Sequence, residues 1–314
     1  MTVVEPAVPG VRLAAIPGLF REIGDLKRVQ VAHAAGSVAQ RSFVRSWAAL
    51  VAGADPGRVA GVQCAAAVAG ARLAGVDAAV LLNAGLEPGE VTRVLGRAVD
   101  EVAGGLHAVV LARVHAALPH LVADALERPI CDQPGGVPPF VGALCSQPRA
   151  GATAPGKPRL IVEPTENHGE HCWTVAVYGA LLAEDLDADP GAVFLLGLAH
   201  HLHNASLPDA GFAGDNLLGE HLDAVQHRLT ERELTTLPNA LADRVRGLLQ
   251  LRVDAGSPVG RAFHAADVLD RVLQVHHHAR AAAFTVEQAL VELELVHAGP
   301  VTDYQHAVLA AAGL

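Results

Sequence analysis

The spacing of apolar positions along the chain predicts helices rather than strands. After Glu87, apolar side chains recur at three- and four-residue intervals, at Val91, Val94, Leu95 and Val99. That interval places them on one face of a helix. No stretch alternates between apolar and polar residues in the way of a half-buried strand. We therefore predict an all-α fold, a helical bundle.

Helix starts are marked by capping residues and by prolines in the first turn. Examples are Ser37, Asp55-Pro56, Asp189-Pro190 and Ser257-Pro258. Together with the apolar pattern, these signals predict helices over residues 38–47, 87–126, 169–185, 190–203, 258–279 and 286–297, one around 217–230, and others that begin at 56 and 302. Gly104-Gly105 is expected to divide the second of these.

The character of the chain changes between residues 129 and 164, a segment that holds eight prolines and five glycines. It is either a flexible linker or an ordered strap, because apolar residues such as Phe140 and Leu160 give it something to pack with. We take it as a boundary between a helical domain of residues 1–128 and a second helical domain of residues 165–314.

Composition narrows the class of partner. The chain has 314 residues, 51% of them hydrophobic, with 33 acidic against 23 basic side chains and a net charge of −10. The sequence has no cluster of basic residues that would bind a nucleic-acid backbone or an anionic membrane surface. No apolar run reaches the roughly 20 residues needed to span a bilayer. The four cysteines form no Cys-x-x-Cys pair. We therefore predict a cytoplasmic protein that acts on a small molecule, without a nucleic-acid or membrane partner.

The basic residues near the N-terminus are interpreted as a solvated helix face, and an anion-binding surface is the alternative. This group contains Arg21, Lys27, Arg28, Arg41 and Arg45.

Seventeen histidines are the chain's main source of chemistry, and those of the second half fall into three short phrases. These are Glu170-His171-Cys172-Trp173, His200-His201-Leu202-His203 and His264-Ala265-Ala266-Asp267. Each lies on or at the end of a predicted helix, so inward-facing side chains from three helices can converge on one metal ion. Imidazole and carboxylate ligands suit iron, manganese, cobalt or zinc, and the residue types do not choose among them.

The segment Thr165-Glu166-Asn167-His168-Gly169-Glu170-His171-Cys172-Trp173 resembles the opening motif of the 5′-deoxynucleotidase branch of the HD-domain superfamily of metal-dependent phosphohydrolases. An apolar run leads into His200 29 residues after His171, where the family has its His-Asp pair, and the family's last ligand matches Asp267. The resemblance covers roughly residues 160–280. It implies an all-α domain with one divalent metal held by His171, His200, His201 and Asp267.

The same resemblance implies hydrolysis of a small phosphorylated or nucleotide-like substrate, with Asp209 or His203 managing protons. Two departures from the family pattern concern this chemistry. His201 stands where the family has the aspartate of its His-Asp pair, and Asn204 stands where the nucleotidase branch has a glutamate. Asparagine cannot take a proton, and imidazole cannot bridge two metals as a carboxylate does.

Two other functions stay open at this point. The chain is also similar to the di-iron HD oxygenases, which have two further histidine ligands. His221 matches the first, but no histidine lies between Asp243 and Asp254 for the second. The other alternative is a non-catalytic HD-like module that binds a ligand or a partner. Metal content separates the three functions.

Overall fold

The computed structural model describes residues 13–127, 136–161, 163–282, 285 and 295–314. Its α-helices are α2 (Pro17–Asp25), α3 (Val38–Val51), α4 (Pro56–Leu73), α5 (Ala78–Asn83), α6 (Pro88–Val102), α7 (Ala108–Leu126), α8 (Pro139–Ser146), α9 (His168–Leu182), α10 (Pro190–Ala199), α11 (Gly211–Leu218), α12 (Leu222–Leu234), α13 (Asn239–Leu249), α14 (Pro258–Ala282) and α15 (Thr302–Ala311). Short 3₁₀ helices are η1 (Ala103–Gly105), η2 (Glu184–Leu186), η3 (Leu202–Ala205), η4 (Gly219–His221) and η5 (Gln250–Val253).

The prediction of an all-α fold is confirmed. Within the described ranges the only β-type pairings are isolated bridges, and no strand forms. The predicted helix over 286–297 falls almost wholly outside the described residues. The predicted ranges did not include α2, α5, α8, α11 and α13, all of which are short.

The capping residues act as the sequence predicts. The side chains of Ser37, Asp55 and Asp189 each accept a hydrogen bond from a backbone N–H in the first turn of α3, α4 and α10. Those groups have no partner within the helix, so the caps stabilise its start. The Gly104-Gly105 pair separates α6 from α7, as expected. Thr302 differs, because its hydroxyl donates to the carbonyl groups of His297 and Gly299 instead of capping α15.

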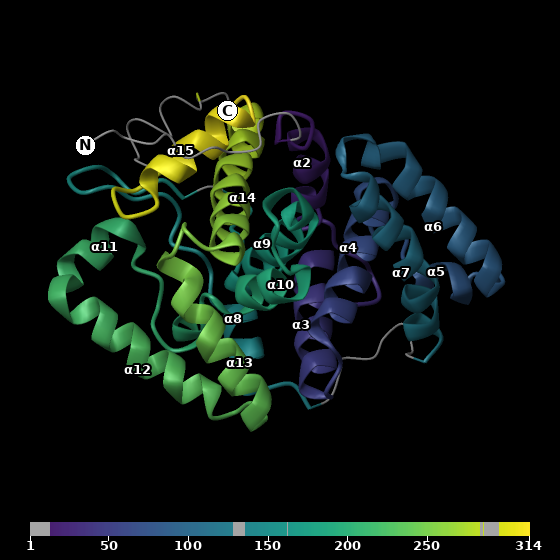
Figure 1. Cartoon of the computed structure of the whole chain (residues 1–314), viewed down its shortest axis with the longest axis horizontal. Helices are drawn as coiled ribbons and strands as arrows, with labels where there is room; N and C mark the ends of the chain where they lie inside the picture. Colours follow the sequence, from purple (N-terminus) through teal and green to yellow (C-terminus); the bar gives the residue numbers. More distant parts are fainter. Residues whose placement is uncertain (1–12, 128–135, 162, 283–284, 286–294) are drawn as a thin grey trace.

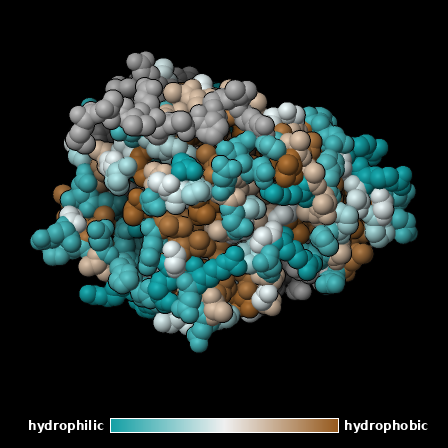
Figure 2. Space-filling model, viewed as in Figure 1, coloured by the Kyte–Doolittle hydropathy of each residue, from teal (hydrophilic) through white to brown (hydrophobic). Residues whose placement is uncertain are grey.

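Helices α9 and α10 lie in the middle of the molecule (Figure 1). Helices α4 to α7 lie toward one end, and α11 and α12 lie toward the other. The viewed face is hydrophilic at both ends, and apolar side chains gather near its middle (Figure 2).

One hydrophobic core joins the two predicted domains. Phe43 and Trp47 of α3 are fully buried in the same cluster as Trp173 and Phe194 of the second half. Helix α3 packs on α9, and α4 packs on α10. The division at residues 129–164 therefore stays a prediction about chain organisation, and the packing runs across it.

The described part of the proline-rich segment has features of the predicted strap. Pro139 starts α8, whose Phe140 and Leu144 are buried. Ala152 and Leu160 then exchange backbone hydrogen bonds. Residues 136–161 thus pack in part, while Ile161 is 54% exposed, and the choice between linker and strap for the whole segment stays a prediction.

Helix α7 is long and apolar enough to cross a membrane when it is judged by length and composition alone. It is the single helix of this kind in the described part of the chain, and the sequence analysis expected none. One such helix is weak evidence, since core helices of soluble proteins meet the same criterion. The absence of a membrane partner stays a prediction.

Close contact between α9 and α10 sets the position of the histidines that these helices carry. A Cβ atom at Gly197 would lie 2.5 Å from the Cα of Ala176, and one at Gly179 would lie 2.4 Å from a methyl group of Val193. Glycine at these positions lets the two helices approach more closely than side chains would allow. Every residue of α9 is buried, so its position is determined on all sides.

Gly197→Ala is expected to destabilise the fold, because the new methyl group would meet backbone atoms of α9 that cannot move aside. We expect a loss of about 1–3 kcal/mol in the free energy of unfolding, measured by chemical denaturation. The control is Gly247→Ala in α13, where a Cβ would meet nothing within 4 Å. That variant should be as stable as the wild type or more so. Equal stability of the two variants would contradict the close packing.

Candidate metal centre

His171 lies in the first turns of α9 and is completely buried. Its Nδ1 is 2.7 Å from Oδ2 of Asp270 on α14. An ionised carboxylate only accepts hydrogen bonds, so Nδ1 carries the ring proton and donates it to Asp270. The lone pair of His171 is therefore on Nε2. A metal-binding histidine commonly has this arrangement, with its other nitrogen held by a carboxylate.

His200 follows the last turn of α10 and presents its ring in the same way. Its Nδ1 donates to the carbonyl oxygen of Gly197 at 2.7 Å, which leaves the lone pair on Nε2. The Nε2 atoms of His171 and His200 are 3.2 Å apart. The two lone pairs therefore face each other across a buried gap.

A cation between the two nitrogens fits this geometry. Two lone pairs repel each other unless a positive charge lies near both. Nitrogen ligands lie about 2.0–2.1 Å from zinc, which puts two of them roughly 3.3 Å apart on a tetrahedral ion. The separation of 3.2 Å between His171 and His200 is close to that value. The residues present therefore fit a metal ion.

His201 turns toward the same place because the helix ends just before it. Its backbone leaves the helical conformation, with φ −110° and ψ 22°, so the 100° divergence of adjacent helical side chains does not apply. Its Nδ1 donates to Oδ1 of Asn204 at 2.8 Å, and the Asn204 amide donates to the carbonyl of Leu207. Nitrogen atoms of His171, His200 and His201 lie within 4.8 Å of one another.

Asn204 therefore holds His201 in one tautomer, which is a different role from that of the glutamate it replaces. Nε2 of His201 is left as an acceptor, and Nη1 of Arg149 lies 3.2 Å from it. The Arg149 guanidinium thus occupies the free side of this ring.

Asp267 on α14 supplies the carboxylate. Its Oδ1 is 3.4 Å from Nε2 of His171, and its Oδ2 pairs with Arg271 one turn later at 3.2 Å. Burial alone would raise the pKa of the Asp267 carboxyl. The charge of Arg271 is the main opposing effect, and this pKa is held well below its ordinary value. The group is ionised at neutral pH and suited to bind a cation.

The histidines are in the form that metals bind. Burial lowers the pKa of His200 well below its ordinary value, and the neighbouring His171 adds to this effect. Burial and the nearby His200 do the same for His201. Both rings are therefore neutral at physiological pH. The Nε2 lone pair of His201 accepts from Arg149 at 3.2 Å, so a metal ion bound there would take the place of this hydrogen bond.

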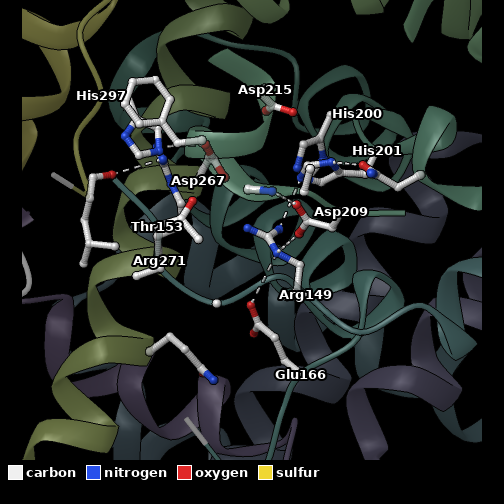
Figure 3. A pocket seen from close by; sticks show the side chains of 18 of the residues that line it. Arg149, Thr153, Glu166, His200, His201, Asp209, Asp215, Asp267, Arg271 and His297 are labelled. Atoms are coloured by element: carbon white, nitrogen blue, oxygen red, sulfur yellow. Dashed lines mark hydrogen bonds and ion pairs between the residues drawn. The ribbon is translucent and has the colours of Figure 1, made fainter. Parts of the chain in front are cut away.

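These side chains lie at one end of a cavity of about 510 Å³. His200, His201 and Asp267 line it, while His171 lies beneath them. Figure 3 shows Arg149 between Glu166 and Asp209, with the two histidines beyond. Three arginines line the walls, namely Arg149, Arg252 and Arg271.

Asp209 and His203, the two residues predicted to transfer protons, both line the cavity, but their surroundings differ. Asp209 accepts backbone N–H groups of Ala150 and Gly211 on its two oxygens, so it fixes the strap to the following loop. His203 is buried, and its Nδ1 has no hydrogen-bond partner in the described part of the chain. Burial and the Arg252 charge lower the pKa of His203 to about 4. A catalytic role for either residue stays a prediction.

His221 does not take part in this cluster. It ends η4 on the surface with its side chain 77% exposed, and it does not line the cavity. Its assignment as a possible ligand is corrected, because an exposed side chain outside the cavity lining cannot join the buried ligand atoms.

Three charged residues of the site were not assigned to it from the sequence. Asp270 follows Asp267 by three residues, a helical spacing that could have drawn attention to it. Glu166 lies just before α9, within the recognised motif. Lys27 belongs to the basic group interpreted as a solvated face, yet its side chain is only 2% exposed. No local pattern distinguishes it from a surface lysine.

Metal binding is tested first by elemental analysis of protein purified without a metal-binding tag. The wild type should hold near one equivalent of metal, and His171→Ala or Asp267→Ala should lose most of it because each removes a converging ligand atom. His221→Ala is the matched control and should keep full occupancy, since its ring is on the surface. Full occupancy in all three variants would refute the assignment.

His201→Asp tests whether the second histidine of the pair faces the metal. A carboxylate there is a harder ligand, so the variant should favour Mg²⁺ or Mn²⁺ over Zn²⁺ more than the wild type does. Competitive titration of the metals measures this preference. An unchanged preference would mean that His201 is not a ligand.

The comparisons with known proteins agree with this geometry. No significant match was found among curated proteins or among solved structures. A family model described as HD domain matches residues 141–297, which is half of the chain. The matched segment contains the converging side chains of α9, α10 and α14. The chain therefore belongs to the HD domain family.

Proposed function

We propose that this protein is a metal-dependent phosphohydrolase that acts on a small phosphorylated or nucleotide-like substrate. The observation that carries the proposal is the combination of metal-suited groups and arginines in one cavity. His200, His201 and Asp267 line the same space as three guanidinium groups. Its volume of about 510 Å³ falls in the range of small-molecule sites, roughly 300–1,000 Å³.

Arg252 is the guanidinium best suited to a phosphate group. It is buried, and its hydrogen bonds go to neutral partners, the carbonyl of His200 and the amide oxygen of Gln226. No carboxylate lies within 4 Å of it among the residues that the structure describes. Burial lowers the pKa of Arg252 even though the charges of Asp223 and Asp267 oppose this effect, so the nearby carboxylates offset only part of the cost of burying this cation. An anionic substrate would supply further negative charge.

Arg149 and Arg271 are already paired, and they support the site in another way. Arg271 neutralises Asp267, and Arg149 lies between Glu166, Asp209 and His201. A phosphoryl group beside His201 would be within reach of the Arg149 guanidinium. Arginine binds phosphate through two parallel N–H groups, which also orients it.

The chain's own residues have separate roles around the metal position. A bound divalent ion would lower the pKa of a coordinated water and polarise a phosphoryl oxygen. Asp270 and Gly197 hold the rings of His171 and His200 with their Nε2 lone pairs toward each other, and Asn204 fixes the tautomer of His201. His203, neutral at pH 7 and buried at the cavity wall, is placed to accept a proton. The strap and its Thr153 close one side of the cavity.

The oxygenase alternative has less support, because the extra histidine that it would need, His221, is on the surface. A non-catalytic binding module would use the same cavity and the same arginines. Iron content with oxygen consumption would favour the oxygenase. Stoichiometric zinc, manganese or cobalt with phosphate release would favour the hydrolase.

Arg252→Met should weaken substrate binding, because it removes the unpaired positive charge and keeps most of the side-chain volume. Charge-assisted hydrogen bonds are worth about 1.5–3 kcal/mol, so kcat/KM should fall about 10- to 150-fold. The measurement is phosphate release from a panel of nucleoside and sugar monophosphates, with Mn²⁺, Co²⁺ and Zn²⁺ in turn.

The matched control is Arg244→Met, which removes an exposed arginine of α13 that does not line the cavity. Its kinetics should equal those of the wild type. If the wild type releases phosphate from no member of the panel with any metal, the hydrolase proposal fails. If Arg252→Met and Arg244→Met behave alike, Arg252 does not bind the substrate.

A further inference from the structure

Lys27 is a buried lysine that lies 144 residues before His171 and contacts the centre of the metal site. It follows the last turn of α2, and its side chain is 2% exposed. Its Nζ lies 2.6 and 2.8 Å from the two oxygens of Asp270 and 2.7 Å from Oε2 of Glu166. Both carboxylates belong to the second half of the chain.

Asp270 connects this ammonium group to a proposed metal ligand. Its Oδ2 accepts from Nζ of Lys27 and also from Nδ1 of His171 at 2.7 Å. Its side chain is 2% exposed, so water does not compete for either oxygen. The direction of the Asp270 carboxylate is therefore set by these two donors together.

The carboxylates of Glu166 and Asp270 require a positive charge between them. Oxygen and nitrogen atoms of Glu166, His171 and Asp270 lie within 4.8 Å of one another, a grouping that could itself hold a metal ion. The Lys27 ammonium fills that position. A buried carboxylate without a positive partner is strongly unfavourable. With Lys27 absent, Asp270 would turn toward other donors and release the His171 ring.

We propose that Lys27 is a positioning residue of the metal site, which holds the Asp270 carboxylate against His171 and so directs the His171 lone pair toward the metal. The inference rests on the proposed metal-dependent function. It gives the N-terminal helices a part in the site, although the matched family segment begins only at residue 141.

The test is the dissociation constant of Mn²⁺, measured by competition with a chelator for wild type, Lys27→Met and Lys27→Arg. Partners behind a metal ligand are typically worth 10- to 100-fold in metal affinity. Lys27→Met should therefore bind Mn²⁺ about 10- to 100-fold more weakly. Lys27→Arg keeps the charge and should recover most of the affinity.

Tyr178→Phe is the control for a role in stability alone. The Tyr178 hydroxyl donates to the carbonyl of Phe20, so it joins α2 to α9 without touching a proposed ligand, whereas Lys27 joins the end of α2 to α14 and to the segment before α9. Both Tyr178→Phe and Lys27→Met should lower the melting temperature, and only Lys27→Met should weaken Mn²⁺ binding. Equal Mn²⁺ affinity in Lys27→Met and wild type, or equal weakening in both variants, would overturn the inference.

A double-mutant cycle with Asp270→Asn tests the route through Asp270 and allows for a Lys27→Met variant that does not fold. Removing both charges leaves fewer unpaired groups than removing one. If Lys27 acts through Asp270, the double variant should bind Mn²⁺ as Asp270→Asn alone does. Further weakening would overturn the inference and leave the proposed function standing. A wild type that binds no metal would remove both.

Discussion

A hydrogen bond between the Asp270 carboxylate and Nδ1 of His171 decides which nitrogen of that ring can bind a metal. With the proton held on Nδ1, the lone pair of Nε2 faces that of His200 at 3.2 Å. Two nitrogen lone pairs that face each other at this distance are stable only with a positive charge nearby. This buried hydrogen bond therefore makes the contact between α9 and α10 suitable for a cation. The other features of the site serve to keep that bond in place.

Helix packing brings the partners together. Helix α9 carries His171, α10 ends at His200, and α14 carries both Asp267 and Asp270 one turn apart. Glycines at the contact between α9 and α10 let the backbones approach, and the complete burial of α9 prevents it from rotating. The end of α10 then allows two consecutive histidines to face one point. A continuous helix would have turned His201 away.

The charge distribution links the site to the rest of the molecule. Each carboxylate at its centre has a cationic partner, with Asp267 beside Arg271 and Asp270 beside Lys27. Arg252 differs, since its described partners are neutral. Positive charge is therefore left over on the cavity wall, which is the property that an anionic substrate would use. The paired charges hold ligands in place, and the unpaired one is available for binding.

The sequence by itself determined the helices, their caps and the candidate ligands of the second half. These depend on local properties, namely the 3.6-residue period, side-chain capping of free N–H groups, and a motif whose residues are adjacent in the chain. Tertiary structure alone decided the rest. Lys27 and Arg149 enter the site from other segments, so no local spacing relates them to His171. The same reason explains His221, which matched by position in the chain and is carried to the surface by the fold. Burial also changes what a residue does. On an exposed helix face Lys27 would be a solvated charge, but in the fold its side chain is 2% exposed and is a fixed counter-ion of Asp270 and Glu166.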